Sequence, residues 1–205
     1  MRLYVVRHGQ PDVSRTERPL DWPLTELGHR QASRVGQWMA REGVSAIYTS
    51  PLRRAAETAG EICAATGLVA CARPDFSEYF IPDSMRDFRG LTVAELKCAY
   101  AFLALPADMP EDGWWPRWPE TWEDLDRRVV RLARELIEAW GRTEAAVVLV
   151  GHGATCKSIV TAVTGRVLTD EAGHSHCGVT LLEWAPESGG TIVFLNRTDL
   201  FRPTQ

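Results

Sequence analysis

The sequence lacks the cysteine pattern of a structural metal site or a disulfide framework. The five cysteines are scattered, no two form a C-x-x-C pair, and their odd number leaves at least one without an intramolecular partner. Small secreted domains instead carry even sets of cysteines at regular spacings. This usage favours reduced, mostly buried thiols and predicts a cytoplasmic location.

Three further features are missing: a basic excess, a membrane-spanning run, and repeated or low-complexity sequence. The formal net charge is −4, so the chain has no overall basic surface for nucleic acid. No apolar run is long enough to cross a bilayer, and the N-terminus enters a strand without the pattern of a signal peptide. We therefore expect no nucleic-acid or membrane partner and no export. With 45% hydrophobic content, residues 1–205 are predicted to form one domain around a substantial core.

The chain does contain a regular alternation of strand and helix patterns. Short apolar, β-branched runs alternate with longer segments of helical periodicity, an order typical of a mainly parallel sheet. We predict an α/β fold, a three-layer sandwich with helices on both faces of the sheet and a C-terminal hairpin at one edge. The predicted strands are 3–6, 46–49, 68–72, 146–150, 179–184 and 191–195, and the predicted helices are 26–42, 51–66, 92–104, 120–140 and 154–164.

Two histidines directly follow predicted buried strands, each beside glycine. His8 ends the first strand in an Arg-His-Gly tripeptide, and His152 ends a later strand in Gly-His-Gly. Open α/β sheets present their chemistry at this end of the strands. The arginine can neutralise phosphoryl oxygens, and the helix after His152 offers unpaired N–H groups to an anion. If the two strands are neighbours, the histidines meet and form a phosphate site with an imidazole nucleophile. Rings more than about 8 Å apart could not share one phosphoryl group.

A third cationic element begins the predicted helix 51–66. Ser50 is expected to be the N-cap, and Pro51 to occupy the first turn. Arg53 and Arg54 then fall in that turn, where the helix dipole disfavours a cation, so a bound anion would explain basic residues there. A solvated surface position is the simpler interpretation for Arg53.

Four ordered motifs resemble the histidine phosphatase (phosphoglycerate mutase-like) superfamily. They are Arg-His-Gly at 7–9, Pro-Leu-Thr-Glu-Leu-Gly-x-x-Gln-Ala at 23–32, Ser-Pro-Leu-x-Arg-Ala-x-x-Thr-Ala at 50–59 and Gly-His-Gly at 151–153. The resemblance extends from residue 3 to about residue 184, nearly the whole chain.

The resemblance implies a role for each matching residue. His8 would be the nucleophile and would form a phosphohistidine. Arg7, Arg54 and His152 would complete a cationic pocket that stabilises charge on the equatorial phosphoryl oxygens. Ser14 stands where many members carry an asparagine, and its hydroxyl would donate one hydrogen bond to phosphate.

The reaction also needs a proton donor for the leaving alkoxide. The family places an acidic glutamate after the strand that follows the arginine helix, and Glu78 occupies this place after strand 68–72. A carboxyl group that faces a bound phosphate is pushed towards its protonated form, as an acid catalyst requires. The chain departs from the family pattern here, because the glycine-containing turn comes later, and Asp83 is the rival acid.

Other residues are expected around the phosphate. Gly153 would bring a backbone N–H group to it, and His176, ahead of strand 179–184, would line its rim. The segment 105–122 is rich in tryptophan and proline, and Trp114 and Trp115 are candidates for a lid that selects the leaving group. They could equally cap the core or form a dimer face.

Three other interpretations compete. The segment 151–158 is similar to a nucleotide-binding P-loop, but Cys156 replaces the required glycine. His174 and His176 form an H-x-H pair without a partner carboxylate, which is a weak metal signal. A non-catalytic phosphate sensor would need the charges but not the nucleophilic His8.

The sequence therefore predicts a metal-independent phosphatase, without a cofactor, that hydrolyses a small phosphomonoester through a phosphohistidine. A phosphoglycerate mutase-type phosphotransferase is the alternative, because additional cations could hold a bisphosphate for re-donation. The candidates for those cations are Arg15, Arg18, Arg86 and Arg89. The expected partner is a small phosphate ester, and a homodimer is left open.

Overall fold

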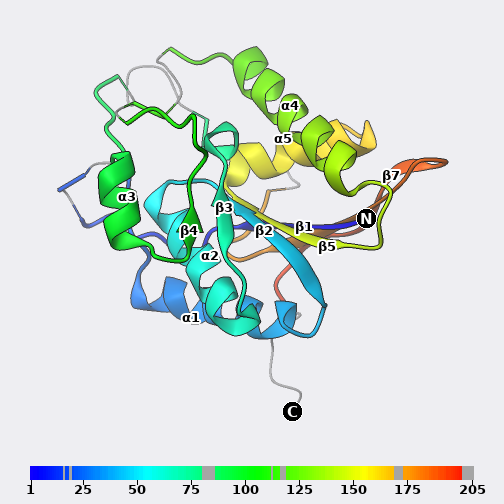
Figure 1. The fold of residues 1–205 in the computed structure, drawn as a ribbon, viewed down its shortest axis with the longest axis horizontal. Coiled ribbons are helices and arrows are strands. Elements are labelled where there is room, and N and C mark those ends of the chain that lie inside the picture. The colour runs from blue at the N-terminus through cyan, green and yellow to red at the C-terminus, as the bar shows by residue number, and fades with distance from the viewer. Residues whose placement is uncertain are drawn as a thin grey trace.

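The computed structural model describes residues 1–15, 17–18, 20–79, 86–111, 113–115, 119–168 and 173–199 (Figure 1). Its strands are β1 (Arg2–Arg7), β2 (Val44–Thr49), β3 (Ala70–Ala72), β4 (Leu103–Ala104), β5 (Ala146–Gly151), β6 (Val179–Ala185) and β7 (Gly189–Arg197). Its helices are α1 (Glu26–Met39), α2 (Arg53–Thr66), the 3-10 turn η1 (Pro74–Phe76), α3 (Val93–Ala99), α4 (Trp122–Trp140) and α5 (Gly153–Thr164).

The described strands form one sheet in the order β4-β3-β2-β5-β1-β6-β7. Neighbours from β4 to β1 pair in parallel, whereas β6 and β7 form an antiparallel hairpin at the edge. Helices α1 and α2 cover one face, and α4 and α5 cover the other (Figure 1). The predicted α/β three-layer fold with a C-terminal edge hairpin is confirmed.

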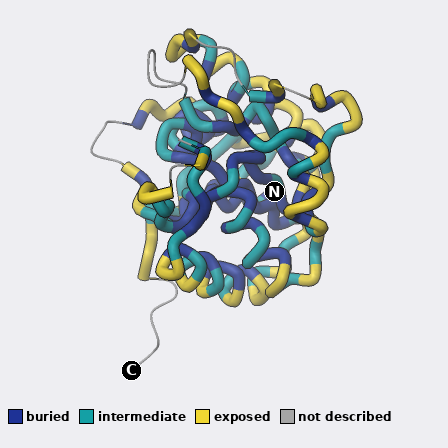
Figure 2. The backbone as a smooth tube through the Cα atoms, turned by 90° about the vertical axis from the view of Figure 1, so that its left-hand side faces the viewer, coloured by how far each residue is buried: buried dark blue, intermediate teal, exposed yellow. Residues whose placement is uncertain are grey.

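The central strands are apolar on both sides because both faces are covered. Along β1, Tyr4 and Val6 pack under α1 and α2, whereas Leu3 and Val5 pack under α4 and α5. Figure 2 shows the result, with the buried part of the chain in the middle of the molecule and the exposed part in the outer helices and turns. Among the described helices, none is both long and apolar enough to cross a membrane.

The prediction of a helix over 92–104 is wrong in its second half. Helix α3 ends at Ala99, because Tyr100 leaves the helical conformation with φ −133°. The next residues form β4, where Leu103 pairs with Ala70 of β3 and is buried. A two-residue strand has no periodicity of its own, so only the neighbouring strand defines it.

All five cysteines are free thiols, and Cys63, Cys156 and Cys177 are buried. Burial raises the pKa of Cys63 to about 11 and that of Cys177 to about 12, in keeping with thiols that stay protonated.

Candidate active site

The sheet brings the two strand-end histidines together. Strands β1 and β5 pair in parallel with Arg7 opposite Gly151, so the next residues of both strands leave the sheet side by side. The His8 backbone N–H donates to the Gly151 carbonyl at 2.9 Å, and the ring centroids of His8 and His152 are 5.2 Å apart. This separation is short enough for both imidazoles to contact one phosphoryl group.

His8 is buried, and its hydrogen bonds define which nitrogen can react. Its Nδ1 lies 2.7 Å from the Gly9 carbonyl oxygen, which can only accept, so Nδ1 carries the proton. The lone pair is then on Nε2, to which Arg54 donates from Nε at 3.2 Å. Burial, and secondarily the Arg54 charge, hold the pKa of His8 well below its usual value. His8 is therefore a neutral imidazole whose Nε2 carries no proton.

His152 has the opposite arrangement, and Ser50 sets it. The Ser50 hydroxyl oxygen lies 2.9 Å from His152 Nε2 and accepts a hydrogen bond from the Leu52 N–H at 3.2 Å. We assign the Ser50 proton to the bond with Nε2, which places the imidazole proton on Nδ1. Nδ1 is buried without a partner among the described residues, so it can donate to an anion. Burial, followed by the Arg54 charge, holds the pKa of His152 well below its usual value.

Ser50 is not the N-cap that the sequence predicts. The N-cap of α2 is Leu52, which has no side-chain cap, and the helix begins two residues later than predicted, at Arg53. Asp21, which is fully buried, instead accepts the Arg53 N–H through Oδ1 at 2.9 Å and so caps the helix from a distant loop. Burial raises the pKa of Asp21. The sequence gives no local signal for this contact, because the two partners are 32 residues apart.

The two arginines expected at the phosphate lie beside the histidines. Arg54, in the first turn of α2, is 7% exposed and donates from Nη1 to the Leu20 carbonyl at 2.8 Å. Arg7 donates from Nη1 to the His174 carbonyl, and its Nε is buried without a partner in the described part of the chain. Both guanidinium charges lower the pKa of His8, which indicates that they lie close to it. Arg53 pairs instead with Glu57 at 3.8 Å, with its side chain 27% exposed.

Glu78 follows η1 and reaches the N-terminus of α5. Its Oε1 accepts hydrogen bonds from the Tyr79 N–H at 2.9 Å and the Ala154 N–H at 3.3 Å. Gly153 lies directly beneath it, since a Cβ there would be 4.0 Å from Glu78 Oε2. The Glu78 charge raises the pKa of Arg54, although burial of Arg54 outweighs it. The rival acid, Asp83, lies outside the described residues.

Two further expected residues have different surroundings. His176 lies beside His8, with ring centroids 5.6 Å apart, and burial followed by the Arg7 charge lowers its pKa. Ser14 is exposed, and its hydroxyl donates to Asp12 at 2.5 Å. The structure therefore puts His176 next to His8 and ties Ser14 to its own loop.

Two tryptophans of the predicted insertion, Trp114 and Trp115, pack inward. Trp114 is 5% exposed, donates from Nε1 to the Leu91 carbonyl at 2.6 Å, and would be 2.7 Å from a Cβ at Gly90. Trp115 is half-buried and meets Trp114 edge to face, with centroids 5.6 Å apart. This packing favours the core-capping interpretation over the lid at Trp114.

The structure also bears on the competing interpretations. His174 is buried with Nε2 2.9 Å from the Thr180 hydroxyl, and burial lowers its pKa to about 4. No group of three or more potential ligands for a metal occurs among the described residues. Of the cations considered for a bisphosphate, Arg18 is paired with Glu95 and donates to the Gly90 carbonyl.

Comparisons with known proteins agree with this geometry. Residues 3–198 match the family described as the histidine phosphatase superfamily (branch 1). Glucosyl-3-phosphoglycerate phosphatase from Mycobacterium tuberculosis is 33% identical over 171 residues, which cover 79% of this chain and 74% of the relative. A putative phosphoserine phosphatase 2 from Hydrogenobacter thermophilus is 28% identical over 206 residues, covering 96% and 95%.

A solved structure is also similar. The structure of mycobacterial glucosyl-3-phosphoglycerate phosphatase in complex with inorganic phosphate matches with a TM-score of 0.68 at 28% identity, and the match covers 98% of this chain and 99% of the other. The complex of the same enzyme with VO3 has a TM-score of 0.67. The family match, the phosphatase relatives and the paired histidines lead to one conclusion. The chain belongs to the histidine phosphatase superfamily and is a phosphoric monoester hydrolase.

Proposed function

We propose that the chain hydrolyses a small phosphomonoester through a phosphohistidine on His8. The observation that carries this proposal is the pairing of His8 and His152 at 5.2 Å, with Arg54 donating to His8 Nε2. A pure binding site would use the same cations, but it would not need a neutral, buried imidazole whose lone pair lies beside them.

In the first half-reaction, His8 Nε2 attacks phosphorus and the ester P–O bond breaks. The donors of Arg7, Arg54 and His152 Nδ1 neutralise charge on the equatorial oxygens, which is the main contribution that a protein makes to phosphoryl transfer. The Glu78 carboxyl group gives its proton to the leaving oxygen, so the alcohol departs neutral.

In the second half-reaction, water attacks the phosphohistidine and the P–N bond breaks. The Glu78 carboxylate, now without its proton, accepts one from that water, and phosphate leaves with His8 returned to the neutral form. Support for this role comes from the contact of Glu78 with the first turn of α5, the helix that begins directly after His152. No metal ion is required for either step.

The substrate is proposed to be a small metabolite that carries a carboxylate as well as the phosphate ester. The relatives named above are phosphatases of glucosyl-3-phosphoglycerate and phosphoserine, and both compounds combine these two groups. A cytoplasmic location remains a prediction of the sequence, which leaves a homodimer open.

The test uses p-nitrophenyl phosphate with excess chelator, followed by 3-phosphoglycerate with bisphosphoglycerate. Phosphate release from the first supports the hydrolase, isomerisation of the second supports the mutase, and neither reaction supports a binding protein. The variant His8→Asn should show no turnover, and rapid quenching should trap no alkali-stable phosphoenzyme. His29→Asn, a matched control on the surface of α1, should keep both. Full activity of His8→Asn would exclude the phosphohistidine.

A further inference from the structure

A single arginine holds the backbone of the segment that carries Glu78. Arg128 of α4 donates from Nη1 to the Asp75 and Ser77 carbonyls, each at 2.7 Å, and from Nη2 to the Glu78 carbonyl at 3.0 Å. Its remaining donors contact Glu120, from Nε at 2.6 Å and from Nη2 at 3.1 Å. All five N–H groups of the guanidinium thus have an acceptor.

This arrangement is buried and electrically balanced. The side chain of Glu120 is 3% exposed and that of Arg128 is 11% exposed. A buried ion pair of this kind is costly to break, because removal of one partner leaves the other charge uncompensated. Since no donor of Arg128 is left over, it is not available to bind a phosphate, although its charge helps to lower the pKa of His152.

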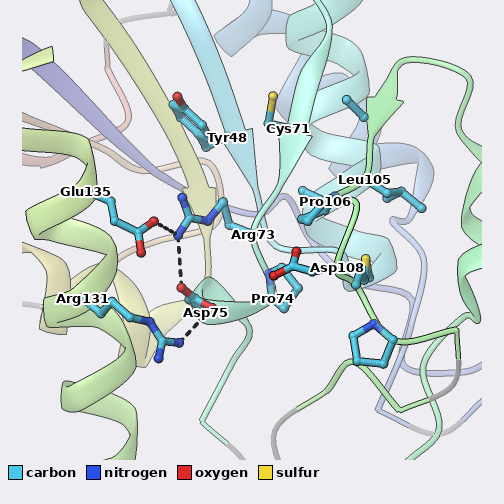
Figure 3. Close-up of a pocket in the computed structure, with 14 residues that line it drawn as sticks. Tyr48, Cys71, Arg73, Pro74, Asp75, Leu105, Pro106, Asp108, Arg131 and Glu135 are labelled. Carbon is cyan, nitrogen blue, oxygen red and sulfur yellow. Dashed lines mark hydrogen bonds and ion pairs between the residues drawn. The ribbon is translucent and has the colours of Figure 1, made fainter. Parts of the chain in front are cut away.

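The same segment is fixed from two other directions. Phe76 is fully buried against the end of β5, where a Cβ at Gly151 would lie 2.1 Å from its ring. On the outer side, the Asp75 carboxylate accepts from Arg73 at 3.1 Å and pairs with Arg131 at 3.3 Å, at the edge of a hollow of about 630 Å³ (Figure 3). Neither His8 nor His152 lines this hollow.

Arg128 and Arg131, both on α4, therefore make different contacts with one segment. Arg131 pairs with the Asp75 side chain, a contact that Figure 3 draws, and its own side chain is 63% exposed. Arg128, one turn earlier, contacts three backbone carbonyls, the last of them belonging to Glu78 itself. The direction of the Glu78 carboxyl group depends on that backbone.

We infer that Arg128, held by Glu120, is a positioning residue that aligns the Glu78 carboxyl group for proton transfer to the leaving group. The inference rests on the proposed role of Glu78. Lysine cannot replace the arginine, since an ammonium group has three donors and no planar fork. Loss of the contact displaces the acid while the nucleophile and the phosphate-binding cations stay in place.

The test compares two substrates of similar size, p-nitrophenyl phosphate and benzyl phosphate. Nitrophenolate leaves without a proton, whereas the benzyl alkoxide needs one. We measure kcat/KM, which reports the steps up to departure of the alcohol and is independent of phosphohistidine hydrolysis. The variants are Glu78→Gln, Arg128→Gln, Arg128→Lys and the matched control Arg131→Gln.

Glu78→Gln should lower kcat/KM for benzyl phosphate by about 10²–10⁴-fold and affect p-nitrophenyl phosphate far less. Arg128→Gln should reproduce this selectivity with a loss of about 10²-fold, as expected for a displaced acid, and Arg128→Lys should not restore it. Arg131→Gln should keep the ratio of the two substrates. If Arg128→Gln does not fold, Glu120→Gln replaces it in the same comparison.

The outcomes separate the two claims. Equal losses on both substrates in the Arg128 and Glu120 variants, with selective loss in Glu78→Gln, would overturn the inference and leave the acid assignment intact. An unchanged ratio in Glu78→Gln would overturn the acid assignment, and the inference with it. Neither result bears on the nucleophile, which His8→Asn tests separately.

Discussion

Acid should destabilise this protein through its buried histidines. His8, His152 and His174 are each at most 3% exposed, and burial is the largest cause of the lowered pKa of all three. In the unfolded chain these groups have the ordinary pKa of 6.5. As the pH falls below that value, the unfolded state binds protons that the native state does not, so the free energy of unfolding decreases.

The magnitude follows from this linkage. Between about pH 7.5 and about pH 5.5, a histidine that stays neutral in the native state lowers the free energy of unfolding by about 1.4 kcal/mol. His174, with a pKa of about 4, is still neutral over this range. Burial also lowers the pKa of His8 and His152 well below the ordinary value, so each adds a loss in the same direction, and the three together lower the free energy of unfolding by up to about 4 kcal/mol. The stabilisation is fully present above the unfolded pKa and disappears towards acid.

The assay is denaturant unfolding at both pH values in a buffer without phosphate, which would bind the site. His174→Asn should reduce the pH-dependent loss by about 1.4 kcal/mol, and His8→Asn combined with His152→Asn should reduce it further, by up to about twice that amount. Ser188→Ala, an exposed control in the turn before β7, should show the loss of the parent protein. If the histidine variants lose as much stability as the parent, these imidazoles are protonated in the folded state and the assignment of His8 as a neutral nucleophile is wrong.

Three further predictions concern packing and charge. Trp114→Ala should lower the free energy of unfolding by about 3–5 kcal/mol, whereas Trp122→Ala, which truncates a side chain that is 57% exposed, should cost far less; equal denaturation midpoints would contradict this. Gly151→Ala should cost about 1–3 kcal/mol in the same measurement, because its Cβ would meet the ring of Phe76, and unchanged stability would show that the ring can move away. Arg54→Gln should lower kcat on p-nitrophenyl phosphate on the order of 10²–10³-fold, and a change in KM alone would mean that this cation only binds the substrate.

The alternation of strands and helices along the chain, and the two histidines at strand ends, could be predicted because both depend on local pattern. A parallel strand that is covered on both faces is apolar throughout, so β1 and β5 stand out in the sequence, and His8 and His152 mark their ends. Whether β1 and β5 are neighbours in the sheet could not be predicted, because no residue in either strand specifies its partner. The pairing of Arg7 with Gly151 supplied that information.

The residues that support the site could not be predicted in the same way. Asp21 caps α2 from a loop, and Arg128 holds carbonyl groups about 50 residues earlier in the chain. Backbone carbonyls are the same at every residue, so a sequence pattern cannot identify which of them an arginine will reach. Ser50 is a related case: its residue type predicts a helix cap, but its hydroxyl bonds the buried imidazole of His152, and the buried Asp21 caps the helix instead.

The different roles of the two histidines also come from their partners and not from their motifs. Both are neutral, buried and next to glycine, so their sequences suggest equivalent groups. The Gly9 carbonyl accepts a hydrogen bond from the Nδ1–H of His8, so the lone pair of that ring is at Nε2, whereas Ser50 donates to Nε2 of His152, so the proton of that ring is at Nδ1. One ring can therefore attack phosphorus while the other donates to a phosphoryl oxygen. Because a neutral imidazole has one donor and one acceptor, an exchange of these two partners would reverse the roles: Nε2 of His8 would carry a proton and could not attack, and the lone pair would be on Nδ1 of His152.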